Sequence, residues 1–204
     1  MKRLKNYYTN FSTNPKYIFT SLLCCVMLTN ISAQLSKKYN NLQSALKNID
    51  SVFILDLSGK KLTEVPKEIG QLAHLKILIL KNNKLSNLTE ECKLLKDLET
   101  IDLSKNKFEK FPLSLREFKN LKRIILNRNS IKEIPNDIKH LKNLEYLDLW
   151  SNEIENISSS IGELKDLEEL DLRVIMFSTD EKKRISNLLP NCKVYFSNSC
   201  NCGY

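Results

Sequence analysis

Apolar residues return along the middle of the chain at a constant interval of 23 residues. The leading register of this repeat is occupied by Leu75, Leu98, Leu121, Leu144 and Leu167. Two more apolar registers follow three and five residues later, and the second holds Leu80, Leu103, Leu126, Leu149 and Leu172. Alternation of apolar and polar positions with period two is typical of a strand with one buried face. The pattern therefore predicts a stack of identical units, each with one short strand and one return segment.

An asparagine follows each predicted strand in a single register, at Asn83, Asn106, Asn129 and Asn152. These side chains fall among apolar neighbours, so their polar atoms need hydrogen-bond partners inside the protein. A side-chain amide has two N–H donors and one carbonyl acceptor, which suits the backbones of adjacent units. We therefore predict an asparagine ladder. Lys60 and Ile175 stand in the same register at the two ends, so the first and last units are imperfect.

The return half of each unit has apolar residues three or four positions apart, which predicts short helical turns behind the sheet. One unit shows this spacing at Ile131, Ile134, Ile138 and Leu141, and Pro66, Pro112 and Pro135 share one register. In this segment the sequence resembles the leucine-rich-repeat family, in its 23-residue class with a Leu/Ile-Pro-x-x-Ile motif, over about residues 52–172. Thr89 and Ser158 replace the proline in two units, and Cys92 takes a buried register.

This resemblance implies an α/β fold: a right-handed solenoid, or short horseshoe, with a parallel concave sheet and helical or 3-10 return segments. The family includes Ras-binding scaffold proteins and many bacterial surface or secreted proteins. Its motif residues are structural, so the resemblance says more about fold than about function.

Different patterns on either side of the repeats predict caps. Residues 34–51 have apolar side chains at helical spacing, namely Leu35, Tyr39, Leu42, Leu46 and Ile49, which predicts one helix over the N-terminal end of the core. Residues 175–204 are expected to form a helix capped by Thr179 and ended near Pro190, then a strand at 192–196 and a tail. The repeats themselves occupy residues 52–174.

Residues 1–33 have the pattern of a secretory signal peptide. A basic lead without acidic residues runs to Lys16, an apolar core follows at residues 18–28, and Ala33 stands where a signal peptidase would cleave. The apolar core is shorter than the roughly 20 residues of a membrane-spanning helix, so no transmembrane anchor is expected after cleavage. The alternative is a buried apolar helix of an intracellular protein.

Three cysteines, Cys192, Cys200 and Cys202, fall close together near the C-terminus. In an oxidising compartment this grouping indicates a disulfide, although the spacing does not choose the pair. A metal site is the alternative, but no fourth ligand stands nearby, so we expect no metal. Cys92 is interpreted as a small buried apolar residue.

The charge distribution and the absence of catalytic motifs argue against nucleic-acid binding and against catalysis. The formal net charge of +8 falls to +4 without residues 1–33, which hold four basic and no acidic residues, and no basic stripe with interleaved aromatics is present. Nucleic-acid binding is therefore not expected. No phosphate loop, zinc-protease motif or nucleophile elbow occurs, and His74 and His140 lie in different registers. We therefore expect neither an enzyme nor a cofactor.

The outward positions of the strands are not dictated by the repeat, so their identity is informative. Aromatic and arginine residues among them are typical anchors of protein interfaces, and isoleucines add apolar area. Acidic residues beside them would add polar specificity. The predicted binding face consists of Ile77, Ile79, Asp102, Arg123, Ile125, Arg128, Tyr146, Asp148, Trp150, Asp171 and Arg173. The alternative is that Ile, Tyr and Trp150 only cover neighbouring strands.

The sequence thus predicts an exported, non-catalytic module that binds a protein through its concave sheet face, with a surface glycan as the second class of partner. Two alternatives remain open. One is an intracellular scaffold of the Ras-binding leucine-rich-repeat kind, with residues 1–33 retained. The other is a passive spacer in a surface layer, with no specific ligand.

Overall fold

A computed structural model of the chain describes residues 37–197. The chain divides into two units, Met1–Lys37 and Lys38–Tyr204, and the fold described here is that of the second unit. The predicted signal peptide, at residues 1–33, lies outside the described residues.

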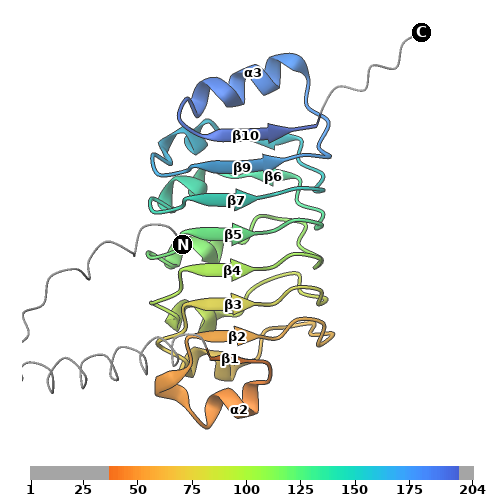
Figure 1. Ribbon diagram of the computed structural model, residues 1–204. Coiled ribbons are helices and arrows are strands. Elements are labelled where there is room, and N and C mark those ends of the chain that lie inside the picture. Colours follow the sequence, from red (N-terminus) through yellow and green to blue (C-terminus); the bar gives the residue numbers. More distant parts are fainter. Residues whose placement is uncertain (1–36, 198–204) are drawn as a thin grey trace, which may run out of the picture. The chain divides into compact units, whose positions relative to one another are not determined.

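The described part of the second unit contains a parallel sheet of eight strands, in the order β1-β2-β3-β4-β5-β7-β9-β10 (Figure 1). The strands are β1 (Lys38–Tyr39), β2 (Ile54–Asp56), β3 (Ile77–Ile79), β4 (Thr100–Asp102), β5 (Arg123–Ile125), β7 (Tyr146–Asp148), β9 (Glu169–Leu172) and β10 (Lys193–Phe196). From β2 to β9 each residue pairs with the residue 23 positions further along the chain, as Ile77 pairs with Thr100. The sequence repeat is therefore also the register of the sheet.

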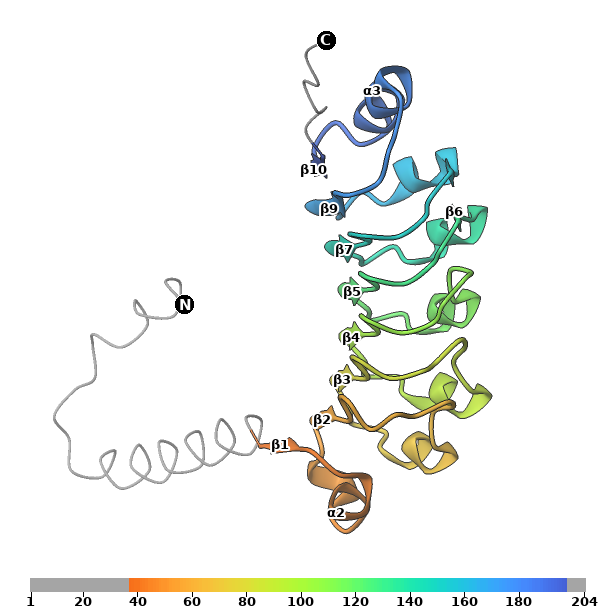
Figure 2. The ribbon, with the colours of Figure 1, turned by 90° about the vertical axis from the view of Figure 1, so that its right-hand side faces the viewer.

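A short 3-10 helix lies in the return half of each repeat, on the side of the stack opposite the strands (Figure 2). These helices are η2 (Lys67–Gln71), η3 (Glu90–Leu94), η4 (Leu113–Glu117), η5 (Asn136–His140) and η6 (Ser159–Glu163). Two-residue strands β6 (Glu133–Ile134) and β8 (Asn156–Ile157) pair in parallel just before η5 and η6. The strands trace a shallow arc that opens away from the 3-10 helices, so the outer face of the sheet is concave.

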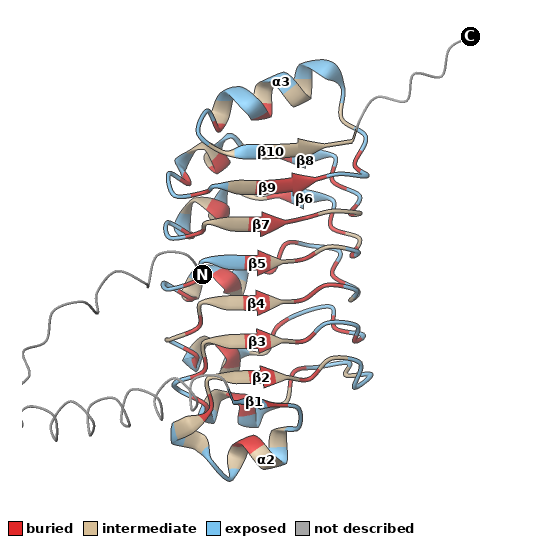
Figure 3. Ribbon diagram, in the orientation of Figure 1, coloured by how far each residue is buried: buried red, intermediate tan, exposed pale blue. Residues whose placement is uncertain are grey.

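One continuous hydrophobic core fills the space between the sheet and the 3-10 helices. The central residue of each strand from β2 to β9 is buried, and Figure 3 shows these positions in line through the stack. Phe108 and Phe118 are the largest fully buried side chains of the return half. Cys92 is also fully buried, in a position that isoleucine or leucine occupies in neighbouring repeats.

The four register asparagines join successive repeats through their side chains. The side-chain amide of Asn129 donates to the carbonyls of Leu126, at 2.8 Å, and of Leu103 in the preceding repeat, at 3.1 Å. Its carbonyl accepts from the backbone N–H of Phe108 at 3.0 Å. Asn83, Asn106 and Asn152 make the equivalent bonds. Each ladder amide therefore satisfies three backbone groups that the turn leaves without a strand partner.

The residue before each ladder asparagine has a left-handed backbone. The positions are Asn82, Lys105, Arg128 and Ser151, and Val174 precedes Ile175 at the end of the array, with φ between 54° and 65°. This conformation is unfavourable for most L-residues and most of all for a β-branched one such as Val174. The chain therefore leaves β3, β4, β5, β7 and β9 through turns with the same left-handed residue, whatever side chain the sequence supplies there.

The N-terminal cap differs from the single helix predicted over residues 34–51. The structure has strand β1, then helix α2 (Leu42–Leu46), then a 3-10 turn η1 (Ile49–Ser51). Tyr39 pairs with Leu55 in the sheet and buries its ring there, because an open edge of β2 offers backbone partners that a helix would leave unused. Asn41 caps α2 by accepting from the backbone N–H of Ser44.

The C-terminal cap is a helix followed by a strand, as predicted. Helix α3 (Thr179–Leu188) precedes β10, which pairs with β9. The helix begins one residue earlier than expected, because Ser178 rather than Thr179 is the N-cap and accepts from the backbone N–H of Glu181 at 3.1 Å. In the described part of the chain, no helix has the length and apolar character needed to cross a membrane.

Candidate partner-binding face

Three columns of side chains point outward from the concave sheet. The first residues of the strands form one column, which runs through Ile54, Ile77, Thr100, Arg123, Tyr146 and Glu169. The third residues form another, which runs through Asp56, Ile79, Asp102, Ile125, Asp148 and Asp171. A last column follows at the strand exits, with Lys81, Ser104, Asn127, Trp150 and Arg173. All predicted binding residues lie on these columns except Arg128, which comes directly after Asn127.

The structure brings the predicted arginines and aromatic residues together in pairs. The guanidinium carbon of Arg123 lies 4.0 Å from the centre of the Tyr146 ring, and that of Arg128 lies 4.6 Å from the centre of the Trp150 ring. Both rings are half-buried and both arginines are exposed. A cation over an aromatic face is attracted by the ring quadrupole, which holds the long arginine side chain in place.

Asp148 lies between these two pairs and is bonded within the protein. One carboxylate oxygen accepts from the backbone N–H of Trp150 at 3.0 Å, and the other accepts from the side-chain amide of Asn127 at 2.6 Å. The residue is only 8% exposed. Burial raises the pKa of the Asp148 carboxyl above its ordinary value, against the lowering effect of these two bonds.

Asp171 is also used internally. It is 5% exposed, and its carboxylate accepts from the backbone N–H of Arg173 and from the Arg173 guanidinium, with the shortest bond at 2.5 Å. The hydrogen bond and the charge of Asp171 raise the pKa of Arg173. Asp148 and Asp171, which the sequence suggested as specificity groups on the surface, thus hold the backbone in place where the chain leaves the strands. Asp102 has one such bond, from the backbone N–H of Ser104 at 2.9 Å, and stays half-buried.

The predicted isoleucines are half-buried rather than openly exposed. Ile77, Ile79 and Ile125 are each covered in part by side chains on the adjacent strands, because neighbouring strands lie only about 4.8 Å apart. Ile77 and Ile79 lie on β3, two strands from β5, so the structure does not bring them into the arginine–aromatic cluster. They form a separate aliphatic area with Ile54.

Sequence reasoning missed two residues on the last strand. Tyr195 of β10 pairs with Asp171, and its hydroxyl lies 3.3 Å from a carboxylate oxygen of Glu169. The Arg173 guanidinium lies 5.7 Å from its ring centre, and the Lys193 amine lies 4.7 Å from it. The alternation of side chains in a strand could have predicted both residues. Val194 pairs with buried Leu170 and so points to the core, which places Lys193 and Tyr195 on the outer face.

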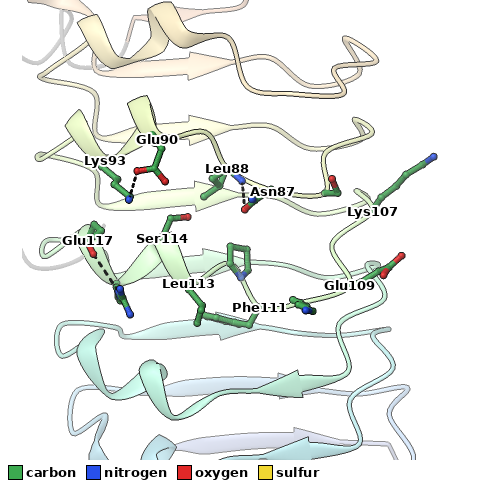
Figure 4. A pocket seen from close by; sticks show the side chains of 14 residues that line it. Asn87, Leu88, Glu90, Lys93, Lys107, Glu109, Phe111, Leu113, Ser114 and Glu117 are labelled. Carbon is green, nitrogen blue, oxygen red and sulfur yellow. Dashed lines mark hydrogen bonds and ion pairs between the residues drawn. The ribbon is translucent and has the colours of Figure 1, made fainter.

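A hollow of the described surface lies elsewhere, on the return side between η3 and η4 (Figure 4). It has a volume of about 630 Å³ and includes Leu88, Phe111 and Leu113, of which Leu113 is 48% exposed. Its charged side chains are largely paired with each other, as Lys93 with Glu90 and Arg116 with Glu117. We place the candidate site on the sheet face because exposed anchors, not paired charges, distinguish an interface.

The predicted disulfide of the C-terminal cysteines stays a prediction. Cys192 is a half-buried free thiol, whereas Cys200 and Cys202 lie outside the described residues. Burial, helped by the charge of Glu169, raises the pKa of the Cys192 thiol to about 11. A thiol with so little thiolate at neutral pH reacts slowly. Within residues 37–197, no group of histidine, cysteine and acidic side chains is arranged to hold a metal ion.

Comparison with known proteins identifies the family. The profile described as "Leucine-rich repeat region" matches residues 31–192, which is most of the chain. The chain belongs to the leucine-rich-repeat family. No curated protein matches the sequence. The fold of this family is commonly a protein-binding module and is typically non-enzymatic.

Solved structures of other leucine-rich-repeat proteins are similar. An internalin, InlF, from Listeria monocytogenes is 19% identical, with a TM-score of 0.55 over 78% of this chain and 53% of its own. The plant peptide hormone receptor RGFR1, solved in complex with RGF2, is 28% identical, with a TM-score of 0.55 over 78% of this chain and 26% of its own. A leucine-rich-repeat protein of Leptospira interrogans is 28% identical over 70% of this chain and 54% of its own, with a TM-score of 0.34. The chain thus spans about half of two of these proteins and about a quarter of the receptor.

Proposed function

We propose that this chain is an exported, non-catalytic module that binds a protein partner through the C-terminal half of the concave sheet, from β5 to β10. The observation on which this proposal depends is the pair of arginine–aromatic contacts on adjacent strands, Arg123 with Tyr146 and Arg128 with Trp150. These contacts hold two large side chains in fixed positions on an open face, which lowers the entropy that binding would cost.

The residue types favour a protein partner. Tyrosine, tryptophan and arginine are the residues most enriched among the energetically dominant positions of protein interfaces. The half-buried rings present an apolar surface, and the exposed guanidinium groups present hydrogen-bond donors beside it. The family and the receptor complex among the similar structures support this class of function. A surface glycan remains the second class of partner.

A capture experiment tests the binding face. The full chain is immobilised and exposed to the surface and extracellular proteins of its own host, beside a Tyr146→Ala/Trp150→Ala variant. The matched control is Leu94→Ala/Leu113→Ala, which removes two exposed apolar side chains from the return side. We expect a partner that the native chain and the control retain and the face variant loses.

Each other outcome contradicts the proposal in a distinct way. Equal capture by the face variant would move the site away from β5 to β10, and loss with the control variant would move it to the return side. Capture of nothing specific would favour the passive spacer.

Export has its own test, because it depends on the pattern of residues 1–33 and not on the face. The intact mass of the native protein, isolated from its host, should correspond to a chain cleaved after Ala33. A chain that retains residues 1–33 and stays inside the cell would favour the intracellular scaffold instead.

A further inference from the structure

The positive charges on the concave face are unequally neutralised. Arg173 forms an ion pair with Asp171, and Lys38 forms one with Asp56, both at 2.5 Å. Arg123 and Arg128 contact only their aromatic rings, and no carboxylate within residues 37–197 is in ion-pair distance of either. Two exposed guanidinium groups are thus held in place with no internal acceptor.

The two buried acidic side chains of this half of the face are already engaged. Asp148 uses both carboxylate oxygens for Asn127 and the backbone of Trp150, and Asp171 is occupied by Arg173. Both carboxylates are buried, so neither can swing outward without breaking these bonds and exposing the strand exits. The arginine charges therefore remain available to a group that comes from outside the chain.

The chemistry of the guanidinium group selects the incoming group. The guanidinium carbons of Arg123 and Arg128 lie over aromatic rings, and the N–H donors of a guanidinium lie in its plane, around its edge. Such a planar fork matches the two oxygens of a carboxylate, with which it forms two parallel hydrogen bonds. The contact with the ring pre-orders the arginine side chain, so less conformational entropy is lost when an acid binds.

The spacing of the two arginines selects the shape of the ligand. Arg123 begins β5 and Arg128 follows its end, so their backbones are no more than about 16 Å apart at about 3.3 Å per extended residue. Ile125 lies between them on the same outward face. In an extended chain, every second side chain points to the same face. Such a chain laid along β5 would therefore place acidic side chains four residues apart over the two arginines, with an aliphatic side chain midway between them over Ile125.

We propose, on the basis of the binding face proposed above, that its occupant is an extended acidic segment of a protein, with carboxylates on Arg123 and Arg128 and an aliphatic residue between them. A long polyanion fits less well, because Asp102 and Glu169 lie on the same face and would repel a continuous run of negative charge.

The test is a selection from a displayed library of random dodecapeptides against the purified full chain. Enriched peptides are synthesised, and their affinities are measured for the native chain and for Arg123→Gln/Arg128→Gln. We expect enriched sequences with two acidic residues four positions apart and an aliphatic residue midway between them. Their affinity should fall at least about tenfold for each arginine removed, because bonds to charged groups are the strongest of their kind.

Two further variants make this result specific. Lys67→Gln/Lys132→Gln changes the net charge equally on the return side, so its peptide affinity should stay within about twofold of the native value. Arg123→Lys/Arg128→Lys keeps the charge and removes the fork, so it should lie between the native chain and the glutamine variant. Thermal melting within about 2 °C of the native chain shows that each variant is folded.

The outcomes separate this inference from the proposed function. A selection that enriches no peptide, or only peptides without acidic residues, overturns the acidic occupant. If those peptides still lose affinity with Tyr146→Ala/Trp150→Ala, the binding face itself stands, and if no face variant affects them, both proposals are wrong. In a separate outcome, no peptide is enriched but the chain is retained on immobilised heparin, and this retention requires both arginines. That result would identify an acidic glycan as the occupant and would also overturn the acidic peptide.

Discussion

The two halves of the concave sheet share one backbone and differ in what they present. Strands β2 to β4 present aliphatic residues, one threonine and two aspartates, with Ile54, Ile77 and Ile79 forming one aliphatic area. Strands β5 to β10 present two arginine–aromatic pairs and a tyrosine that the last strand adds. From β2 to β9 the strand register is the same, at 23 residues per step. The repeat therefore builds outward positions of one geometry and leaves their occupants free to vary, which is how a uniform scaffold acquires a localised site.

The largest effect we expect is on stability, and it should be equal in the two halves because both use the same asparagine ladder. Asn83→Ala in the first half and Asn129→Ala in the second each remove three hydrogen bonds to backbone groups, all of them buried or partly buried. Each should lower the free energy of unfolding by about 3 kcal/mol, because the abandoned groups stay buried. Urea unfolding measures this, and a difference of more than about 1 kcal/mol between the two variants would contradict equivalence.

The next effect separates the halves by their role in binding. With the partner captured above, Trp150→Ala should weaken affinity about 30-fold, the effect of a dominant interface residue. Ile77→Ala in the aliphatic half should weaken it only a few-fold, because it loses a modest half-buried contact. Titration of the purified partner against each variant gives both numbers. The reverse order would place the site on β2 to β4.

A smaller effect concerns the strained turns that both halves share. Val174→Asn should raise the free energy of unfolding by about 1 kcal/mol, because asparagine tolerates the left-handed backbone that valine does not. The reciprocal Asn82→Val should lower it by a similar amount in the first half. The denaturation midpoints of the two variants are compared with that of the native chain, and we expect shifts of opposite sign. Shifts of the same sign would show that side-chain contacts outweigh the backbone preference.

The smallest difference we expect is in pH dependence, between two aspartates of one column. Burial also tends to raise the pKa of Asp56, but its bonds from Lys38 and Ser58 outweigh burial and lower the pKa below the ordinary 3.8. The stability that Asp56 contributes is therefore present above pH 3.8 and lost as the pH falls through the lowered pKa. Asp148 has a raised pKa, so its contribution is present below pH 3.8 and lost as the pH rises through the raised value.

Carboxyl NMR titration should show Asp148 releasing its proton at a higher pH than Asp56. In unfolding experiments over the same pH range, the cost of Asp148→Asn should shrink as the pH rises, whereas that of Asp56→Asn should grow. Coincident titrations of the two carboxyls would show that their environments do not differ as the structure indicates.

The sequence by itself determined the family, the parallel sheet, the position of every repeat and the outward columns. It could do so because a 23-residue period with leucine and asparagine registers leaves one way to bury the apolar side chains and satisfy the amides. Only the tertiary structure decided that Tyr39 lies in a strand, since its partner, Leu55, is 16 residues away and local spacing fits a helix equally well. The fate of each charge was decided there too. Asp148 and Arg123 lie on adjacent strands, 25 residues apart in sequence. Hydrogen bonds at the strand exits engage the Asp148 carboxylate, whereas Arg123 lies over an aromatic ring and keeps its N–H donors free.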